Sequence, residues 1–332
     1  MIIEKAKTAG FCFGVARAME IVEGLLKEGK KVVTLGPLIH NPQVVEDLAR
    51  RGVVSVGGPA EVPPQTVMVI RSHGVGKEVY DEAAALGVEV VDATCPFVAK
   101  IHRIVGKDNP QGKEVVIIGD RDHPEVRGII GHCSGPYTVL RTEEEFAGYF
   151  PGKIPPAGVI MVAQTTFNLL QYSKYSALVG DTPGVDVRKT VCSATWEHQI
   201  EAAELSKRCD VCIVIGGKKS SNTKKLFDIC AEHSRAFQIE TPEELREDMF
   251  IGAKRVGITA GASTPSALIE EVLTRMSEIT KEEFNFEEAL ENSLRTVKRG
   301  QRVTGIVTEV RGNEVVVDIG TKHTGLDRKS VV

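Results

Sequence analysis

Three cysteines stand at one phase of an internal repeat. Each precedes a predicted helix and then a predicted strand, and a glycine ends that strand 24 residues after the cysteine: Cys12 and Gly36, Cys95 and Gly119, Cys192 and Gly216. A single free cysteine is usually core filler, but three at one repeat phase indicate a shared role. A helix start favours the thiolate. Thiolates select iron-sulfur clusters or zinc, and three without a fourth suggest a cubane cluster with one open iron.

The other four of the seven cysteines have no such repeat partners. Cys209 and Cys212 form a Cys-x-x-Cys pair, but they flank the start of the predicted strand 211–215 and no second pair exists to complete a zinc site. Cys133 and Cys230 stand alone. We therefore predict that these four are core residues and that Cys12, Cys95 and Cys192 are the metal ligands.

The elements that must position the three cysteines also repeat. Predicted helices at 16–27, 98–105 and 198–207 are followed by strands at 32–35, 115–118 and 211–215. A second strand in each third runs into Arg71-Ser72-His73, Gln164-Thr165-Thr166 or Gly261-Ala262-Ser263. Helices alternating with buried strands indicate parallel α/β sheets. We expect three α/β units, roughly 1–94, 95–191 and 192–281, arranged around a pseudo-threefold axis with one cysteine from each.

Polar side chains follow all six predicted strands. Ligands of open α/β sheets bind beyond the carboxyl ends of the strands, so these residues should line one central cavity. Taken singly, each is more often a loop residue or a satisfied turn hydroxyl. Together, imidazoles, hydroxyls and an amide suit a phosphate or diphosphate, and the one carboxylate suits a proton donor. The residues are His40, His73, His123, Glu125, Thr165, Thr166, Ser220, Ser221, Asn222 and Ser263.

Composition excludes several classes of function. A chain of 332 residues with 42% hydrophobic residues can bury a core, and a formal net charge of -4 argues against a general polyanion binder. The sequence lacks a signal-peptide pattern and any apolar run near the ~20 residues that span a bilayer, so we expect a cytoplasmic protein without membrane contact. Neither common nucleotide-binding glycine motif is present. Electrons should therefore come from a separate protein.

The character of the chain changes after residue 281. An acidic linker, 282–297, leads into a segment, 298–332, with two alternating strands at 302–310 and 314–319 and a turn at Arg311-Gly312-Asn313. This segment is similar to the opening of an S1-type β-barrel of the OB-fold group, of which only part is present.

With these motifs assembled, residues 1–281 resemble the LytB family of 4-hydroxy-3-methylbut-2-enyl diphosphate reductases. The resemblance is carried by seven motifs in order: Gly-Phe-Cys12-Phe-Gly-Val, Gly-Pro-Leu-Ile-His40-Asn-Pro-Gln-Val-Val, Arg-Ser-His73-Gly, Asp-Ala-Thr-Cys95-Pro, His123-Pro-Glu125-Val, Gln-Thr165-Thr and Ser220-Ser-Asn222. It implies a trefoil of three α/β units around a 4Fe-4S cluster. The stretch at Trp196 and Glu197 is less typical of the family.

The resemblance also implies an activity and residue roles. The substrate, an allylic diphosphate, would lose its hydroxyl at the unique iron to give isopentenyl and dimethylallyl diphosphate, the last step of the methylerythritol phosphate route to isoprenoids. His40, His73, Ser220, Asn222 and Ser263 would hold the diphosphate, with Ser221 in the same motif. Glu125 would relay protons, helped by His123 and Thr165. A ferredoxin or flavodoxin would donate electrons.

Two alternatives stay open at this point. Quinolinate synthase and other dehydratases also use a three-cysteine cluster with an open iron, but their carboxylate substrates call for arginine forks, which the predicted cavity lacks. An RNA-binding or redox-sensing protein would account for the S1-like tail. The negative charge and the lack of an aromatic stacking platform weaken that alternative, and contact of the tail with RNA or the ribosome has no other support in the sequence.

Overall fold

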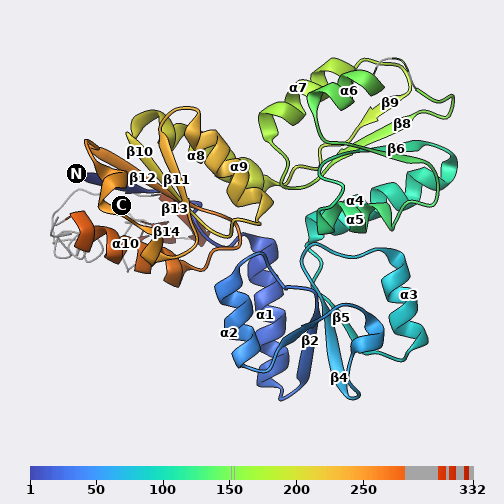
Figure 1. Ribbon diagram of the computed structural model, residues 1–332, viewed down its shortest axis with the longest axis horizontal. Coiled ribbons are helices and arrows are strands. Elements are labelled where there is room, and N and C mark those ends of the chain that lie inside the picture. Colours follow the sequence, from blue (N-terminus) through green and yellow to red (C-terminus); the bar gives the residue numbers. More distant parts are fainter. Residues whose placement is uncertain (151, 153, 281–305, 312–313, 319–324, 329–332) are drawn as a thin grey trace. The chain divides into compact units, whose positions relative to one another are not determined.

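The computed structural model describes residues 1–150, 152, 154–280, 306–311, 314–318 and 325–328. These residues fall into two units, Met1–Thr280 and Lys281–Val332, and each is described by itself. The first unit contains three parallel sheets, which Figure 1 shows in blue to cyan, in green, and in yellow to orange.

Each of the three sheets has four strands, with the orders β3-β2-β4-β5, β7-β6-β8-β9 and β11-β10-β12-β1. The strands are β1 (Ile2–Lys5), β2 (Lys31–Leu35), β3 (Val54–Val56), β4 (Thr66–Ile70), β5 (Val90–Asp92), β6 (Glu114–Ile118), β7 (Tyr137–Leu140), β8 (Val159–Ala163), β9 (Val185–Val187), β10 (Val211–Ile215), β11 (Arg235–Ile239) and β12 (Arg255–Ala260). All pairings within these sheets are parallel.

Helices cover both faces of the three sheets. They are α1 (Phe13–Lys27), α2 (Pro42–Arg50), α3 (Lys77–Ala85), α4 (Pro96–Asp108), α5 (Pro124–Ile130), α6 (Glu143–Tyr149), α7 (Leu169–Val179), α8 (Ser193–Arg208), α9 (Ser221–Ala231) and α10 (Ser266–Thr280). Short 3-10 turns lie at Pro59–Glu61, Asn109–Gln111, Pro242–Glu244 and Glu247–Phe250.

The central strands of the sheets are apolar because both of their faces are buried. Every residue of β4, β8 and β10 is buried. Successive side chains point to opposite faces, so each sheet contributes to two core clusters. In β4, for example, Val67 and Val69 pack towards α1 and α2, whereas Met68 and Ile70 pack towards α3. The predicted α/β class with parallel sheets is confirmed.

The first strand corrects the predicted boundary of the first unit. We assigned residues 1–94 to one α/β unit, but β1 pairs with β12 and so belongs to the third sheet. In Figure 1 the dark blue N-terminal strand lies within the yellow and orange unit. The three sheets are related in a cycle, because an edge strand of each one leads to the cysteine of the next unit. Strand β5 of the first sheet leads to Cys95, β9 of the second leads to Cys192, and β1 of the third leads to Cys12. Each cysteine therefore lies at a crossing from one sheet to the next unit.

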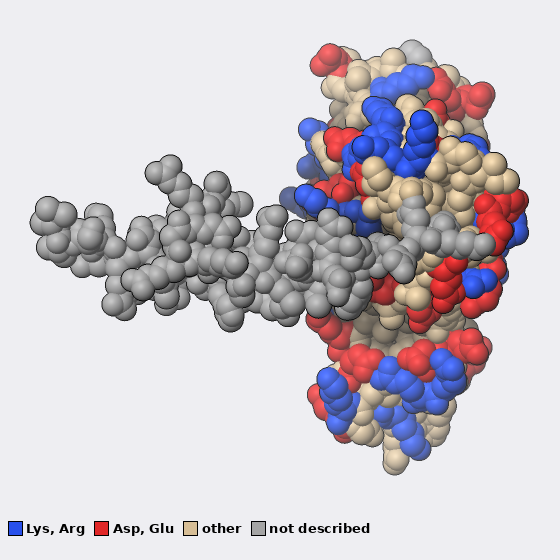
Figure 2. Space-filling view, turned by 90° about the vertical axis from the view of Figure 1, so that its left-hand side faces the viewer, with Lys and Arg blue, Asp and Glu red and all other residues tan. Residues whose placement is uncertain are grey.

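The surface of the first unit carries both signs of charge. Figure 2 shows acidic and basic side chains interspersed over one face of the first unit. None of the described helices combines the length and the apolar character that a membrane span requires.

In the second unit, β13 (Ile306–Arg311), β14 (Glu314–Asp318) and β15 (Gly325–Arg328) form an antiparallel sheet. The two predicted strands are thus present with shorter described bounds. The predicted linker 282–297 and turn residues Gly312 and Asn313 lie outside the described residues.

Candidate functional site

Each of the three repeat cysteines is the N-cap residue of a long helix: Cys12 of α1, Cys95 of α4 and Cys192 of α8. The predicted helices therefore begin earlier than expected, directly after the cysteines. The N–H of each cysteine donates to a backbone carbonyl that lies two residues after the end of a central strand, which is β12, β4 or β8. The pairs are Cys12 with Ala262 at 3.1 Å, Cys95 with Ser72 at 2.9 Å and Cys192 with Thr165 at 3.2 Å. One backbone arrangement thus positions all three sulfur atoms.

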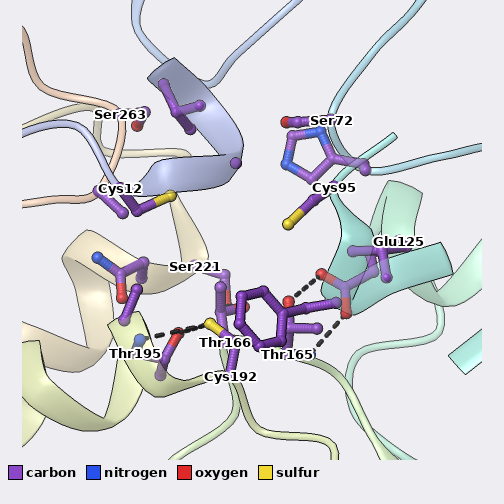
Figure 3. A pocket seen from close by; sticks show the side chains of 18 of the residues that line it. Cys12, Ser72, Cys95, Glu125, Thr165, Thr166, Cys192, Thr195, Ser221 and Ser263 are labelled. Atoms are coloured by element: carbon purple, nitrogen blue, oxygen red, sulfur yellow. Dashed lines mark hydrogen bonds between the residues drawn. The ribbon is translucent and has the colours of Figure 1, made fainter. Parts of the chain in front are cut away.

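The three sulfur atoms turn into one pocket, as Figure 3 shows. We expected the helix starts to lower the thiol pKa values, but burial outweighs them. Burial raises the pKa of Cys95 to about 11, although the amides of Phe97 and Val98 act against this, and burial also raises the pKa of Cys192. In the metal-free protein these two thiols are protonated. A cationic metal group would reverse that preference, because metals bind the thiolate.

The other cysteines lie where the sequence predicted. Cys209, Cys212 and Cys230 are buried in one core cluster beside β10, α8 and α9. Cys133 is half-buried and packs against the core of the second sheet.

Glu125 is a buried carboxylate held by a single threonine. It lies in the first turn of α5 and is 2% exposed. The Thr165 N–H donates to its Oε1 at 2.6 Å and the Thr165 hydroxyl donates to its Oε2 at 2.7 Å. Burial raises the pKa of Glu125 to about 7, and the two bonds from Thr165 act in the opposite direction. Such a carboxyl group can carry a proton near neutral pH and give it up to a bound molecule.

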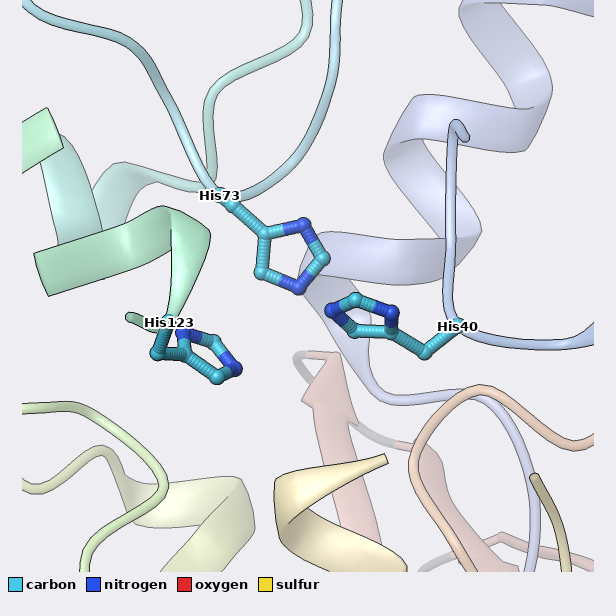
Figure 4. Close-up of side chains that lie close together, drawn as sticks. All are labelled: His40, His73 and His123. Atoms are coloured by element: carbon cyan, nitrogen blue, oxygen red, sulfur yellow. The ribbon is translucent and has the colours of Figure 1, made fainter. Parts of the chain in front are cut away.

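Three histidine rings converge from the loops after β2 and β4 and from the start of α5 (Figure 4). They line the same pocket as the three cysteines. Ring centroids are 4.6 Å apart for His40 and His73, 5.7 Å for His40 and His123, and 5.5 Å for His73 and His123. Burial lowers the pKa of all three rings, that of His123 to about 4, so they are neutral at pH 7. Nδ1 of His123 accepts from the Glu125 N–H at 3.2 Å, which leaves its proton on Nε2 as a donor.

This group could hold either a cation or an anion, because one nitrogen of each ring lies within 4.8 Å of the others. Arg71 favours the anion. Its guanidinium lowers the pKa of each of the three rings, so it already places positive charge beside them. A side chain at Gly36 would collide with it, since an added Cβ would lie 2.4 Å from Nη1. Our sequence reasoning did not single out Arg71, whose signal was its place directly before Ser72 and His73 at a strand end.

The third unit supplies hydroxyl and amide groups at the start of α9. Ser220 is the helix N-cap and accepts from the Thr223 N–H at 3.3 Å. The Thr166 hydroxyl donates to Ser221 at 3.3 Å, and Ser263 donates to the His40 carbonyl at 3.3 Å. Asn222 is 4% exposed, yet neither its Oδ1 nor its Nδ2 has a partner.

Several buried polar atoms of the site share this lack of a partner. They are His40 Nε2, Arg71 Nε, His73 Nδ1, Asn222 Oδ1 and Asn222 Nδ2. A buried polar group without a hydrogen bond costs roughly 1–3 kcal/mol, so such a cluster indicates a site built for a ligand.

The pocket brings together every residue that the sequence predicted for it. The space between its walls, including the part that is open to solvent, is about 690 Å³. The predicted residues in its lining are Cys12, His40, His73, Cys95, His123, Glu125, Thr165, Thr166, Cys192, Ser220, Ser221, Asn222 and Ser263. The lining also includes residues that we had not predicted: Gly14, Val15, Ser72, Phe97, Val98, Ala194, Thr195 and Ala262. Neither arginine nor lysine is among the lining residues.

Comparison with known proteins gives consistent results over the first unit. The family model described as LytB protein matches residues 3–277. A protein of Nautilia profundicola named 4-hydroxy-3-methylbut-2-enyl diphosphate reductase is 42% identical over 284 residues, which are 84% of this chain and 100% of the relative. A protein of the same name from Geobacter metallireducens is 44% identical over 283 residues, covering 84% of this chain and 98% of the relative.

Two solved structures are also similar. One, described as (E)-4-hydroxy-3-methyl-but-2-enyl diphosphate reductase, the terminal enzyme of the non-mevalonate pathway, is 40% identical with a TM-score of 0.61, covering 84% of this chain and 100% of that chain. A reductase from Plasmodium falciparum is 24% identical with a TM-score of 0.78, covering 83% of this chain and 88% of that chain, and it supports the fold.

Proposed function

The chain belongs to the LytB family, and from this membership we propose that it is a 4-hydroxy-3-methylbut-2-enyl diphosphate reductase. The reaction replaces the allylic hydroxyl of its substrate by hydrogen and gives isopentenyl and dimethylallyl diphosphate. It is the last step of the methylerythritol phosphate, or non-mevalonate, route to isoprenoids. The observation that carries the proposal is one pocket in which three equivalent cysteines, a protonatable carboxyl and a set of unpartnered anion-binding groups meet.

Cys12, Cys95 and Cys192 would hold a 4Fe-4S cluster. The donor set fits this group, because the pocket lining offers three soft sulfur ligands and no fourth cysteine. When bound, such a cluster supplies two electrons, one at a time, and a Lewis-acidic iron that has no cysteine ligand. The surrounding residues then have three tasks: to bind the diphosphate, to exclude water and to deliver protons.

The diphosphate would be held by neutral hydrogen-bond donors, with the positive charge of Arg71 nearby. His40, His73 and His123 contribute imidazole N–H groups, and the start of α9 contributes Ser220, Ser221 and Asn222. Ser263 adds a hydroxyl from the loop after β12. The positive charge of Arg71 acts on all three histidine rings and favours an anion beside them. Binding would give partners to the buried polar atoms that now lack them.

Glu125 would deliver the proton that leaves with the hydroxyl. Two electrons and two protons are consumed: the C–O bond breaks, water departs, and a C–H bond forms at one end of the allylic group. Thr165 holds both oxygens of Glu125, and His123 accepts from its N–H, so the carboxyl is oriented before substrate arrives. The second proton needs no protein acid near the far carbon if the diphosphate of the substrate delivers it.

The electrons would come from a partner protein of the ferredoxin or flavodoxin class, because the sequence has no nicotinamide-binding motif. A cytoplasmic location is part of the proposal. We also propose the α/β units 6–94, 95–191 and 192–281, with β1 added to the third, and an S1-like segment at 298–332. The antiparallel sheet β13-β14-β15 agrees with the latter.

Anaerobic turnover tests the function. The protein is reconstituted with iron and sulfide, mixed with a chemically reduced dye, and the oxidation of the dye is followed after the hydroxymethylbutenyl diphosphate is added. We expect substrate-dependent oxidation with both isoprenoid diphosphates as products. Absence of turnover from protein with a verified cluster would contradict the proposal.

A further inference from the structure

Two histidines pack against the site without lining it. His102 lies in α4, the helix that Cys95 begins, and His132 follows the end of α5. Their rings are stacked, with centroids 4.1 Å apart and an interplanar angle of 21°. His102 is 7% exposed and its Nε2 is buried without a partner. His132 is half-buried. Burying an imidazole such as His102 with a ring nitrogen left unpaired is costly, so the contacts of this stacked pair need an explanation.

The His102 ring lies directly against the backbone that carries His73. Gly74 has φ +68°, and an added Cβ there would lie 2.6 Å from Cε1 of His102. On the α5 side, an added Cβ at Gly128 would lie 3.5 Å from the Gly74 carbonyl carbon and 3.4 Å from Nε2 of His102. The peptide after His73 is therefore confined between α4 and α5, with glycine on both sides of the contact.

His132 fixes the next peptide by a hydrogen bond. Its Nε2 lies 3.1 Å from the carbonyl oxygen of Val75, and a carbonyl only accepts, so the imidazole N–H donates. A second bond runs from the Lys77 N–H to the Gly131 carbonyl at 3.2 Å. The loop from His73 to Lys77, which belongs to the first sheet, is thus joined to the C-terminal end of α5, which covers the second.

The N-terminal end of α5 carries His123 and Glu125. This short helix therefore connects the Val75 contact at one end with the anion-binding and proton-donating groups at the other. His73 has no comparable support of its own, because its Nδ1 is buried without a partner. Its place beside His123, with ring centroids 5.5 Å apart, depends on its backbone.

We propose that His132 is a positioning residue: its hydrogen bond to Val75, supported by the stacked ring of His102, sets His73 against His123 at the diphosphate site. The inference rests on the proposed function in taking these two histidines to bind the diphosphate. Because the bond acts on the loop that carries His73, whereas Glu125 keeps both of its bonds from Thr165, its loss should weaken anion binding more than it slows the chemical step.

Three substitutions of His132 separate hydrogen bonding from packing. His132→Phe keeps a ring to stack but has no donor. His132→Asn has an amide too near the backbone to reach Val75, whereas the amide of His132→Gln can take the position of Nε2. The matched controls are the same three changes at His233, an exposed histidine that lies just before β11 and does not line the pocket.

Calorimetric titration of the reconstituted holoenzyme with inorganic diphosphate gives the primary readout, and KM and kcat give the second. Loss of one hydrogen bond should weaken diphosphate binding and raise KM about five- to tenfold in His132→Phe and His132→Asn. We expect kcat within about twofold of the parent, unchanged cluster absorbance, and recovery of affinity in His132→Gln. The His233 variants should behave as the parent.

Parental affinity in His132→Asn, or equal losses in His132→Asn and His132→Gln, would overturn the inference, and this pair decides it even if His132→Phe does not fold. A parent that binds diphosphate but does not turn over substrate would contradict the proposed function alone, because calorimetry needs no turnover. A parent that turns over substrate but does not bind diphosphate would overturn the inference alone.

Discussion

Thr165 donates to both carboxylate oxygens of Glu125, through its backbone N–H at 2.6 Å and its hydroxyl at 2.7 Å, while its own carbonyl accepts from the Cys192 N–H. One residue therefore joins the candidate proton donor to one of the candidate cluster ligands. The geometry of proton delivery and that of metal binding depend on the same short loop after β8.

Glu125→Gln should lower kcat by about 10²–10⁴, the range typical of a lost general acid. The amide keeps the size of the side chain, so cluster absorbance and diphosphate affinity should remain close to those of the parent. Steady-state kinetics under anaerobic conditions measure the effect. Unchanged turnover would remove Glu125 from the reaction.

The pH dependence of kcat/KM should report the same carboxyl. Because burial raises the pKa of Glu125 to about 7, the protonated donor is present below this pH and lost above it, so activity should fall on the alkaline side of about pH 7. In Thr165→Val the ionised form loses a donor, its pKa rises further, and the alkaline limb should move up by about one pH unit. The control is Thr166→Val, whose hydroxyl bonds Ser221 instead. A limb that stays in place in Thr165→Val contradicts the assignment.

Gly14→Ala should impair cluster loading. Gly14 lies in α1, and an added Cβ would lie 2.6 Å from Sγ of Cys95. Gly24 is in the same helix with nothing within 4 Å, so Gly24→Ala is the matched control and should gain up to about 1 kcal/mol of helix stability. Iron and sulfide analysis after reconstitution gives the comparison. Equal iron content in the two variants would show that Gly14 tolerates a side chain.

Asn222→Leu should stabilise the metal-free protein while weakening the site. Both polar atoms of Asn222 are buried without partners, so an apolar side chain of similar shape should raise the melting temperature. Affinity for inorganic diphosphate should fall about tenfold or more.

Asn168→Leu provides the contrast, because Asn168 caps α7 by accepting from the Gln171 N–H at 2.9 Å and its loss should cost about 1 kcal/mol. A lower melting temperature in Asn222→Leu would mean that this amide is already satisfied without ligand.

Much of the site could be predicted from the sequence because its residues occupy equivalent positions in the three repeats. Three cysteines at equal spacing, and polar residues after apolar strands, are local signals, and parallel strands bring their ends together. The helix start beside each cysteine was expected, and Pro96 does take the first helical position, although the predicted helix ranges began later than Phe13, Pro96 and Ser193.

What sequence reasoning missed depends on pairing between distant segments. The residues Ile2–Lys5 carry no local signal that they will pair with β12, about 250 residues away, because the neighbour of a strand is set by the whole fold. In the sequence Arg71 is only the residue that follows a strand, and its nearness to the histidines is a tertiary feature. The His102 and His132 pair gave no signal at all, since each is an isolated residue in the sequence and their stacking is tertiary.

We propose that Cys12, Cys95 and Cys192 would together hold one four-iron cluster, with one iron left without a cysteine ligand. A Mössbauer spectrum of protein reconstituted with ⁵⁷Fe, recorded before and after the hydroxymethylbutenyl diphosphate is added, is the sharpest test of this assignment. We expect four irons per cluster, with about a quarter of the signal distinct from the rest and changed by substrate. A spectrum in which all irons are alike and unmoved by substrate would rule out such a three-cysteine cluster.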